Sequence, residues 1–131
     1  MPGIAYVDSS ALVKLVVAEP ESTALRRHLR TFDRHVTSAL SQTEVLRAVR
    51  RSDSSRIARA KDVLRRVTLF GIDDQVLAAA AALEPPELRT LDALHIATAL
   101  ALGNGLDDFV TYDERQRRAA ELLDLPTTAP A

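Results

Sequence analysis

The chain has 131 residues, of which 47% are hydrophobic and 27% charged, and its net charge at pH 7 is −1. These values predict one globular domain over residues 1–131 and argue against a disordered chain or a membrane protein. The chain has no cysteine, which excludes disulfides, thiolate zinc sites and cysteine nucleophiles. No apolar run approaches the roughly 20 residues of a membrane span, and the first residues lack a signal-peptide pattern. We therefore expect a cytoplasmic protein that does not enter membranes.

Short β-rich segments alternate with segments of helical periodicity along the chain. The first half of the chain shows patterns of a strand over 3–7, a helix capped by Asp8 or Ser9, a helix over 21–29, a strand over 35–39 and a helix opened by an S-x-x-E capping box from Ser41 to Glu44. A helix over 55–66, a strand over 67–72 and a helix over 73–83 follow. The last part shows patterns of a helix capped by Thr90, a strand over 108–112, a helix after it and a short strand near the C-terminus. Strands that alternate with helices indicate an α/β fold with a mostly parallel sheet of four to five strands, flanked by helices.

Four acids fall where such a sheet forms its functional crevice, at the carboxyl ends of the strands. They are Asp8 after the first strand, Glu44 after the second, Asp92 at a helix start and Asp113 after the fourth strand. Each acid alone suits a helix cap or the first turn of a helix. Four carboxylates close together would repel one another, and a divalent cation resolves that conflict. An all-oxygen site predicts Mg²⁺ or Mn²⁺, which suits phosphodiester hydrolysis.

Asp92 raises a separate question, because its helix is apolar on nearly every face. From Leu91 to Leu102 the residues are Leu, Ala or Ile except for Asp92, His95 and Thr98. Such a helix is usually buried, and a buried carboxylate costs several kcal/mol unless a cation or hydrogen bonds compensate it. The sequence therefore predicts a positively charged partner for Asp92.

Four motifs in order now resemble a known family: YVDSSALVKL, SQTEVLRAVRR, LRTLDALHIATAL and FVTYDERQRRAA. Together they resemble the PIN-domain ribonucleases, and most closely the VapC-type toxins of bacterial toxin–antitoxin pairs. The resemblance covers essentially the whole chain and implies the PIN fold. It also implies that Asp8, Glu44, Asp92 and Asp113 are the catalytic residues and the ligands of Mg²⁺ or Mn²⁺, so that the metal would compensate Asp92.

The resemblance implies further properties of the protein. Ser10 and Thr111 correspond to hydroxyls that hydrogen-bond the carboxylates or a water on the metal, although a helix cap and an ordinary strand threonine explain them equally well. The implied activity is endonucleolytic RNA cleavage that leaves a 5′-phosphate and a 3′-hydroxyl. The implied partners are a second copy of the chain and a VapB-type antitoxin, one segment of which lies along the toxin and reaches the acidic pocket.

Positive charge is concentrated beside these acids in the sequence. Residues 45–66 hold seven arginines and Lys61 against two acids, a net charge of +6, whereas residues 71–131 have a net charge of −7. An RNA partner can bind a basic flank beside an acidic centre, because phosphate contacts depend on local charge. Residues one turn or more beyond Glu44 or just after Asp113 are the candidates for RNA contact: Arg47, Arg50, Arg51 and Arg115. A solvated helix face or a contact with a partner protein remains the alternative for them.

Three other readings of the sequence are open. A Mg²⁺-dependent phosphoacceptor domain would need an acidic pair after the first strand and a late lysine, and the chain has a lone Asp8 there and no lysine beyond Lys61. A catalytically silent PIN fold that binds RNA or protein would have no need of four clustered carboxylates. A transition-metal site at Asp92 and His95, three residues apart, lacks the second copy that di-iron bundles use, so His95 is expected to pack in the core or face a second subunit.

Overall fold

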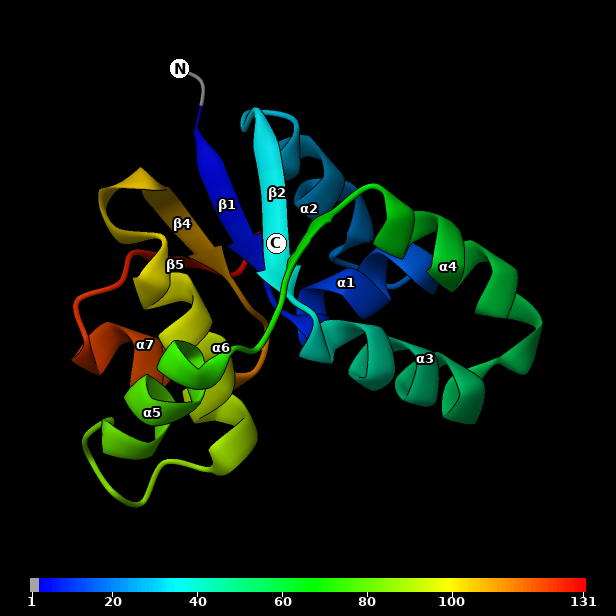
Figure 1. Cartoon of the computed structure of the whole chain (residues 1–131). Coiled ribbons are helices and arrows are strands. Elements are labelled where there is room, and N and C mark those ends of the chain that lie inside the picture. The colour runs from blue at the N-terminus through cyan, green and yellow to red at the C-terminus, as the bar shows by residue number, and fades with distance from the viewer. Residues whose placement is uncertain (1–2) are drawn as a thin grey trace.

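A computed structural model describes residues 3–131, and Figure 1 shows a central sheet with helices on both sides of it. The strands are β1 (Ile4–Val7), β2 (Arg34–Ser38), β3 (Thr68–Phe70), β4 (Leu106–Val110) and β5 (Thr127–Thr128). The helices are α1 (Ser9–Val16), α2 (Ser22–Leu29), α3 (Leu40–Ser52), α4 (Ile57–Arg65), α5 (Asp74–Ala82), α6 (Thr90–Ala101) and α7 (Glu114–Leu122). The predicted α/β fold with a sheet of four to five strands is confirmed.

The five strands are all parallel, in the order β3-β2-β1-β4-β5. The chain runs outward from β1 through β2 to β3 and then returns to place β4 on the other side of β1. The order therefore reverses between β1 and β4. Ligands of open α/β sheets bind at such a switch point, outside the carboxyl ends of the strands, so the residues that follow β1 and β4 stand at the expected crevice.

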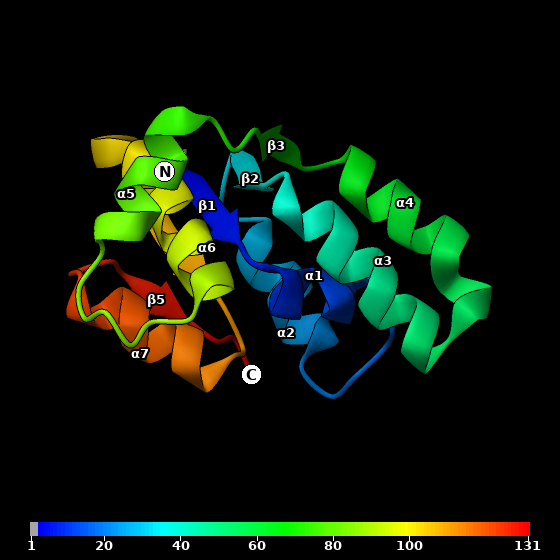
Figure 2. The same cartoon turned by 60° about the horizontal axis from the view of Figure 1, so that its bottom comes forward.

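Alternate residues of β1 pack on opposite faces of the sheet, as the period of a strand requires. Ala5 and Val7 belong to a core that α1, α2, α3 and α4 complete, whereas Tyr6 belongs to a second core that it shares with Phe109. Figure 2 shows the two helical layers, with α1–α4 on one side of the strands and α5–α7 on the other. Tyr6 and Phe109 are fully buried, as their positions within strands predict.

Helix α6 confirms the prediction of a buried apolar helix. Seven of its residues are buried: Asp92, Ala93, His95, Ile96, Ala97, Thr98 and Ala99. It packs on α5, α7, β2 and β4, and its Ala99 belongs to the second core. Among residues 3–131, no helix combines the length and the apolar character that crossing a membrane requires.

Two of the predicted caps are wrong. Helix α3 begins at Leu40, before Ser41, because the Ser38 hydroxyl accepts a hydrogen bond from the Leu40 amide (3.1 Å). The Ser41 hydroxyl instead pairs with that of Thr37 (2.7 Å), which leaves no capping box with Glu44. Thr90 is the first residue of α6, and its predecessor, Arg89, occupies the cap position without a side-chain hydrogen bond.

Candidate active site

Asp8 lies at the carboxyl end of the central strand β1 and caps α1, as predicted. Only 3% of the residue is exposed. Its Oδ1 accepts hydrogen bonds from the Ser10 hydroxyl (2.6 Å) and the Ala11 amide (3.1 Å), and its Oδ2 accepts one from the Thr111 hydroxyl. Burial raises the pKa of Asp8, and the hydrogen bonds from Ser10 and Thr111 oppose that rise. The site therefore holds a desolvated carboxylate whose hydrogen-bond partners are neutral.

Thr111 joins the ends of β1 and β4. Its hydroxyl donates to Asp8 and accepts from the amide of Asp113 (3.1 Å), and the backbone amide of Asp8 donates to the carbonyl of Val110 (3.1 Å). The Ser10 hydroxyl accepts from the amide of Tyr112 (2.9 Å). Ser10 and Thr111 thus contact the Asp8 carboxylate, and they tie it to the strand that leads to Asp113.

Asp92 has a cationic partner within the chain. Its Oδ2 lies 3.2 Å from Nε of Arg115, and another nitrogen of the same guanidinium lies 3.9 Å from Oδ2 of Asp113. Asp113 caps α7 and accepts from the amides of Arg115 and Gln116. The Arg115 guanidinium supplies a positive charge beside Asp92, as the sequence predicts for this carboxylate. One guanidinium joins two of the four predicted ligands.

Glu44 is paired with a histidine that the sequence did not assign to the site. Its Oε1 lies 2.6 Å from Nε2 of His95, whose Nδ1 lies 2.6 Å from the hydroxyl of Tyr6. His95 is 2% exposed, which agrees with the prediction that it packs in the core. The spacing of His95 three residues after Asp92 was the only signal of its position. Nothing in the sequence indicated its contact with Glu44 or with Tyr6.

The four acids lie around one end of the sheet, which we call the acidic edge (Asp8, Glu44, Asp92 and Asp113), but they do not form a compact cluster. Within residues 3–131, no group of three or more acidic or histidine side chains is arranged so that it could hold a metal ion. Each carboxylate instead has its own partners, although those of Asp92 and Asp113 both lie near Arg115. Their oxygens nevertheless suit Mg²⁺ in kind, because this ion binds through one or two carboxylates together with waters and substrate phosphates.

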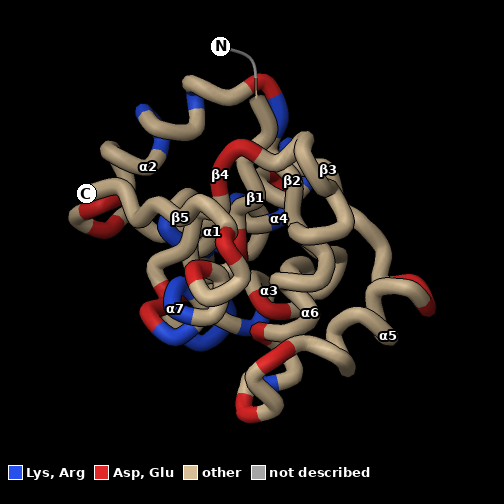
Figure 3. The backbone as a smooth tube through the Cα atoms, turned by 90° about the vertical axis from the view of Figure 1, so that its left-hand side faces the viewer, with Lys and Arg blue, Asp and Glu red and all other residues tan. Residues whose placement is uncertain are grey.

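The four arginines predicted to contact RNA fall into two groups. Arg47, Arg50 and Arg51 are exposed, line one surface hollow and form no ion pair with any residue from 3 to 131. Arg115 is 51% exposed and is already paired with Asp92. Figure 3 shows that acidic and basic residues intermingle around α7, where Arg117 and Arg118 pair with acids one turn away.

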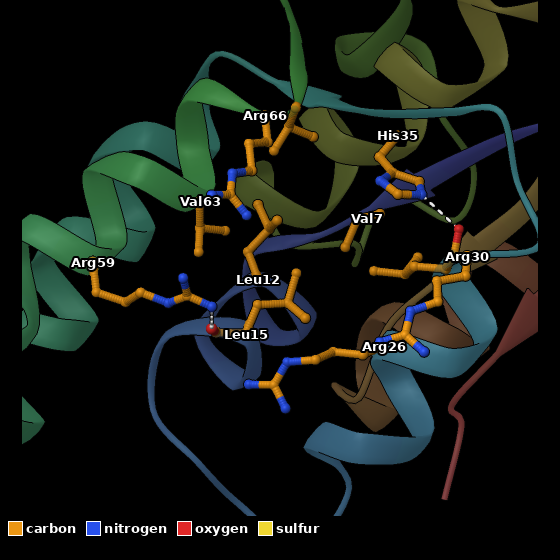
Figure 4. Close-up of a pocket in the computed structure, with 11 residues that line it drawn as sticks. Val7, Leu12, Leu15, Arg26, Arg30, His35, Arg59, Val63 and Arg66 are labelled. Atoms are coloured by element: carbon orange, nitrogen blue, oxygen red, sulfur yellow. Dashed lines mark hydrogen bonds between the residues drawn. The ribbon is translucent and has the colours of Figure 1, made fainter.

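A cavity of about 270 Å³ opens between α1, α2 and α4, and its lining includes none of the predicted site residues. Its floor is apolar and includes Val7, Leu12 and Leu15. Four arginines surround it, and Figure 4 shows their side chains around the apolar floor: Arg26, Arg30, Arg59 and Arg66. Across residues 3–131, none of the four has an acidic partner within ion-pair distance. We call this feature the arginine-rimmed cavity.

The topology removes the phosphoacceptor alternative. Receiver-type domains place the third strand beside the first, in the order 2-1-3-4-5. In this chain β3 is an edge strand that pairs with β2, and β4 takes the place beside β1. The acid that a receiver carries after its third strand would therefore lie at the far edge of this sheet.

The match to a family model identifies the class of the protein. The model described as "PIN: PIN domain" matches residues 5–122, and the chain therefore belongs to the PIN-domain family. Within that family it belongs with the VapC proteins: it is 48% identical to Ribonuclease VapC46 of Mycobacterium tuberculosis (strain ATCC 25618 / H37Rv) over 126 residues, which are 96% of this chain and 97% of that protein. Ribonuclease VapC35 of Mycobacterium tuberculosis (strain CDC 1551 / Oshkosh) is 44% identical over 129 residues, 95% of this chain and 96% of that protein.

Solved structures agree on the fold. A chain of a toxin–antitoxin complex from Klebsiella pneumoniae superposes with a TM-score of 0.72 at 18% sequence identity, covering 97% of this chain and 98% of that chain. At such low identity the likeness concerns the fold alone, and it confirms the PIN-type arrangement that the sequence predicted.

Proposed function

We propose that this chain is the toxin of a VapBC-type pair and that it is a metal-dependent endoribonuclease. The observation that carries the proposal is Asp8, an almost fully buried carboxylate at the topological switch point, with neutral partners and three further acids along the same edge. Burying a carboxylate without a cation costs free energy. A site that binds a metal ion, however, needs a carboxylate at that position. The full-length relatives are both named ribonucleases, which supports the same activity.

The acidic edge would hold Mg²⁺ or Mn²⁺, which would polarise a phosphoryl oxygen of RNA and activate the attacking water. In the proposed hydrolysis, the water oxygen bonds to phosphorus and the bond from phosphorus to O3′ breaks. The products carry a 5′-phosphate and, after proton transfer to O3′, a 3′-hydroxyl.

The chain's own residues would position these groups. Ser10 and Thr111 fix both oxygens of Asp8 in place. Arg115 pairs with Asp92, lies near Asp113 and is exposed enough to donate to an RNA phosphate. The exposed arginines of α3 begin one turn beyond Glu44 and would hold the RNA backbone beside the site: Arg47, Arg50 and Arg51.

Purified protein incubated with total cellular RNA tests the proposed activity. We expect discrete new 5′-phosphate ends in Mg²⁺ or Mn²⁺ and none in EDTA, because the acidic edge needs the cation to act. Asp92→Asn should abolish these ends at matched purity, and sequencing of the ends would also identify the substrate. Cleavage that persists in EDTA, or in Asp92→Asn, would contradict the proposed metal site.

The silent PIN fold remains the second candidate, and one observation favours it. No group of acids in residues 3–131 is arranged to hold a metal in advance. The two candidates differ in metal binding as well as in cleavage. A protein that binds Mn²⁺ is stabilised by it in a thermal melt, so a melting temperature that excess Mn²⁺ leaves unchanged would favour the silent module.

We propose that the VapB-type antitoxin uses the arginine-rimmed cavity. The apolar floor would take an apolar side chain of the antitoxin, and the four unpaired guanidinium groups would bind acidic side chains around it. Val7 lines this cavity and precedes Asp8, so an extended segment that leaves the cavity has a short path to the acidic edge.

We also propose a homodimer, since Leu77 and Leu91 are 49% exposed on α5 and α6.

Charge reversal at the cavity should weaken the antitoxin complex. We expect Arg26→Glu to reduce affinity about tenfold or more, because a negative charge that repels the acidic side chains of the antitoxin replaces a guanidinium that would bind them. Arg27→Glu is the matched control, since Arg27 lies on the same helix outside the cavity. The amount of antitoxin that co-purifies with each tagged variant from the source cells measures the effect. Equal recovery with both variants would contradict this assignment of the cavity.

A further inference from the structure

Two buried polar side chains beside the acidic edge have no part in the proposed reaction. Tyr6 is fully buried on β1, and His95 is 2% exposed on α6. They form a chain of hydrogen bonds with Glu44: the Tyr6 hydroxyl lies 2.6 Å from Nδ1 of His95, and Nε2 of His95 lies 2.6 Å from Oε1 of Glu44. Buried polar groups are normally satisfied, but this chain ends on a predicted catalytic residue.

The direction of each hydrogen bond follows from the donors and acceptors available. The amide of Ser38 donates to the Tyr6 oxygen (3.2 Å), which leaves the hydroxyl proton of Tyr6 free to point at His95. The carboxylate of Glu44 only accepts, so Nε2 of His95 must carry a proton. In the neutral imidazole Nδ1 is then the acceptor for the Tyr6 hydroxyl. Burial raises the pKa of Tyr6 well above its usual value, and the charge of Asp8 raises it further, so the hydroxyl keeps its proton.

The hydrogen bonds from Tyr6 through His95 to Glu44 fix one oxygen of the Glu44 carboxylate and leave the other free. Oε1 is bound by His95, whereas Oε2 has no hydrogen-bond partner among residues 3–131, and 23% of the side chain is exposed. Glu44 comes from α3 and His95 from α6, which cover opposite faces of the sheet (Figure 2). The contact therefore bridges the two helical layers at the end of the strands.

We infer that Tyr6 and His95 are positioning residues that orient Glu44, with His95 held as the Nε2–H tautomer by Tyr6. This inference rests on the proposed function in one respect, that Glu44 binds the metal. Both ring nitrogens of His95 are engaged, so the histidine has no lone pair left for a metal and acts only through Glu44. Partners of this kind hold carboxylate ligands in place at metal sites.

Variants at residue 95 separate positioning from packing. The amide of His95→Gln presents an acceptor oxygen and a donor NH2 group, and so can replace both the acceptor and the donor of the neutral imidazole, whereas His95→Leu fills space and has neither. We expect His95→Leu to weaken Mn²⁺ binding, measured by calorimetry, about 10- to 100-fold, and His95→Gln to retain most of the affinity. Both variants must show cooperative thermal unfolding. Wild-type Mn²⁺ affinity in a folded His95→Leu protein would overturn the inference.

A metal-free measurement decides on the hydrogen-bonded chain itself. In ¹⁵N NMR spectra of the metal-free wild-type protein, we expect a bare Nδ1 and a protonated Nε2 for His95. Tyr6→Phe removes one hydroxyl and should shift the Nδ1 signal strongly while the protein stays folded. A protonated Nδ1 in the wild type, or no change in Tyr6→Phe, would overturn the assignment. Failure of the wild type to bind Mn²⁺ would instead overturn the proposed function. The spectrum would still test whether Tyr6 and Glu44 hydrogen-bond to His95.

Discussion

Asp8→Asn is expected to abolish metal-dependent RNA cleavage while it makes the metal-free fold more stable at pH 7. Loss of a partner that only orients a ligand already costs about 10- to 100-fold in activity or metal affinity, so loss of a proposed ligand should cost at least about 100-fold. The fold should survive because asparagine is as good a helix cap as aspartate. Its side-chain oxygen can still accept from Ser10 and Ala11, which bind Oδ1 of Asp8.

The gain in stability follows from the raised pKa of Asp8. A raised pKa means that the folded protein holds the Asp8 proton more tightly than the unfolded chain, so the stability associated with that proton is present at low pH. It is lost as pH rises above the ordinary aspartate value of about 3.9 and through the raised pKa of the folded protein. The stability difference between Asp8→Asn and the wild type should therefore grow with pH over this interval.

Urea unfolding in EDTA across pH 3 to 8 measures this difference. Asp73→Asn is the matched control, because Asp73 caps α5 in the same way but is exposed. The control should show neither the loss of cleavage nor a stability gain that grows with pH. Cleavage by Asp8→Asn at the wild-type rate, or a stability difference that shrinks as pH rises, would contradict our assignment of Asp8.

Phe109→Ala is expected to lower the free energy of unfolding by about 3–5 kcal/mol, a large part of the roughly 5–15 kcal/mol that stabilises a typical domain. Phe109 is fully buried on β4, and its ring is stacked on that of Tyr6, with centroids 4.9 Å apart and planes 6° from parallel. Removal of the ring would leave a cavity beside Tyr6, so the hydrogen bond from Tyr6 to His95 should loosen as well.

Urea unfolding followed by circular dichroism measures the loss in Phe109→Ala. Phe32→Ala serves as the control, since Phe32 is only partly buried and packs at the margin of the other core. We expect the control to lose clearly less stability than Phe109→Ala. Equal losses of unfolding free energy in the two variants would contradict a larger stabilising contribution from the stacked Tyr6 and Phe109 rings.

The element order and the acidic edge were predictable from the sequence because both depend on local patterns. Periodicity placed every strand and helix within a few residues, and a parallel sheet brings the residues that follow its strands, Asp8 and Asp113 among them, to one edge. The predicted caps at Ser41 and Thr90 were wrong because a local hydrogen bond between Ser41 and Thr37 or an earlier helix start took precedence. Such competition is not visible in a four-residue motif.

The partners of Glu44 and Asp92 were beyond the sequence, since each lies far away in the chain. Glu44 is 51 residues from His95, and Tyr6 is 89 residues from it. Asp92 was expected to need a cation, but the identity of that cation as Arg115 depends on how α7 packs beside α6. The sequence thus predicted that Asp92 needs a positively charged partner, while the packing of the helices brings Arg115 beside it.

Helix α3 has a mechanical consequence for the chain. It carries Glu44 near its start and the exposed residues Arg47, Arg50 and Arg51 on the turns that follow. A rigid helix moves as one body. A polyanion that binds these arginines and displaces them would therefore also displace the carboxylate of Glu44. The contact between Glu44 and His95 opposes that displacement. A residue of α6, in the opposite helical layer, therefore restrains the movement of α3.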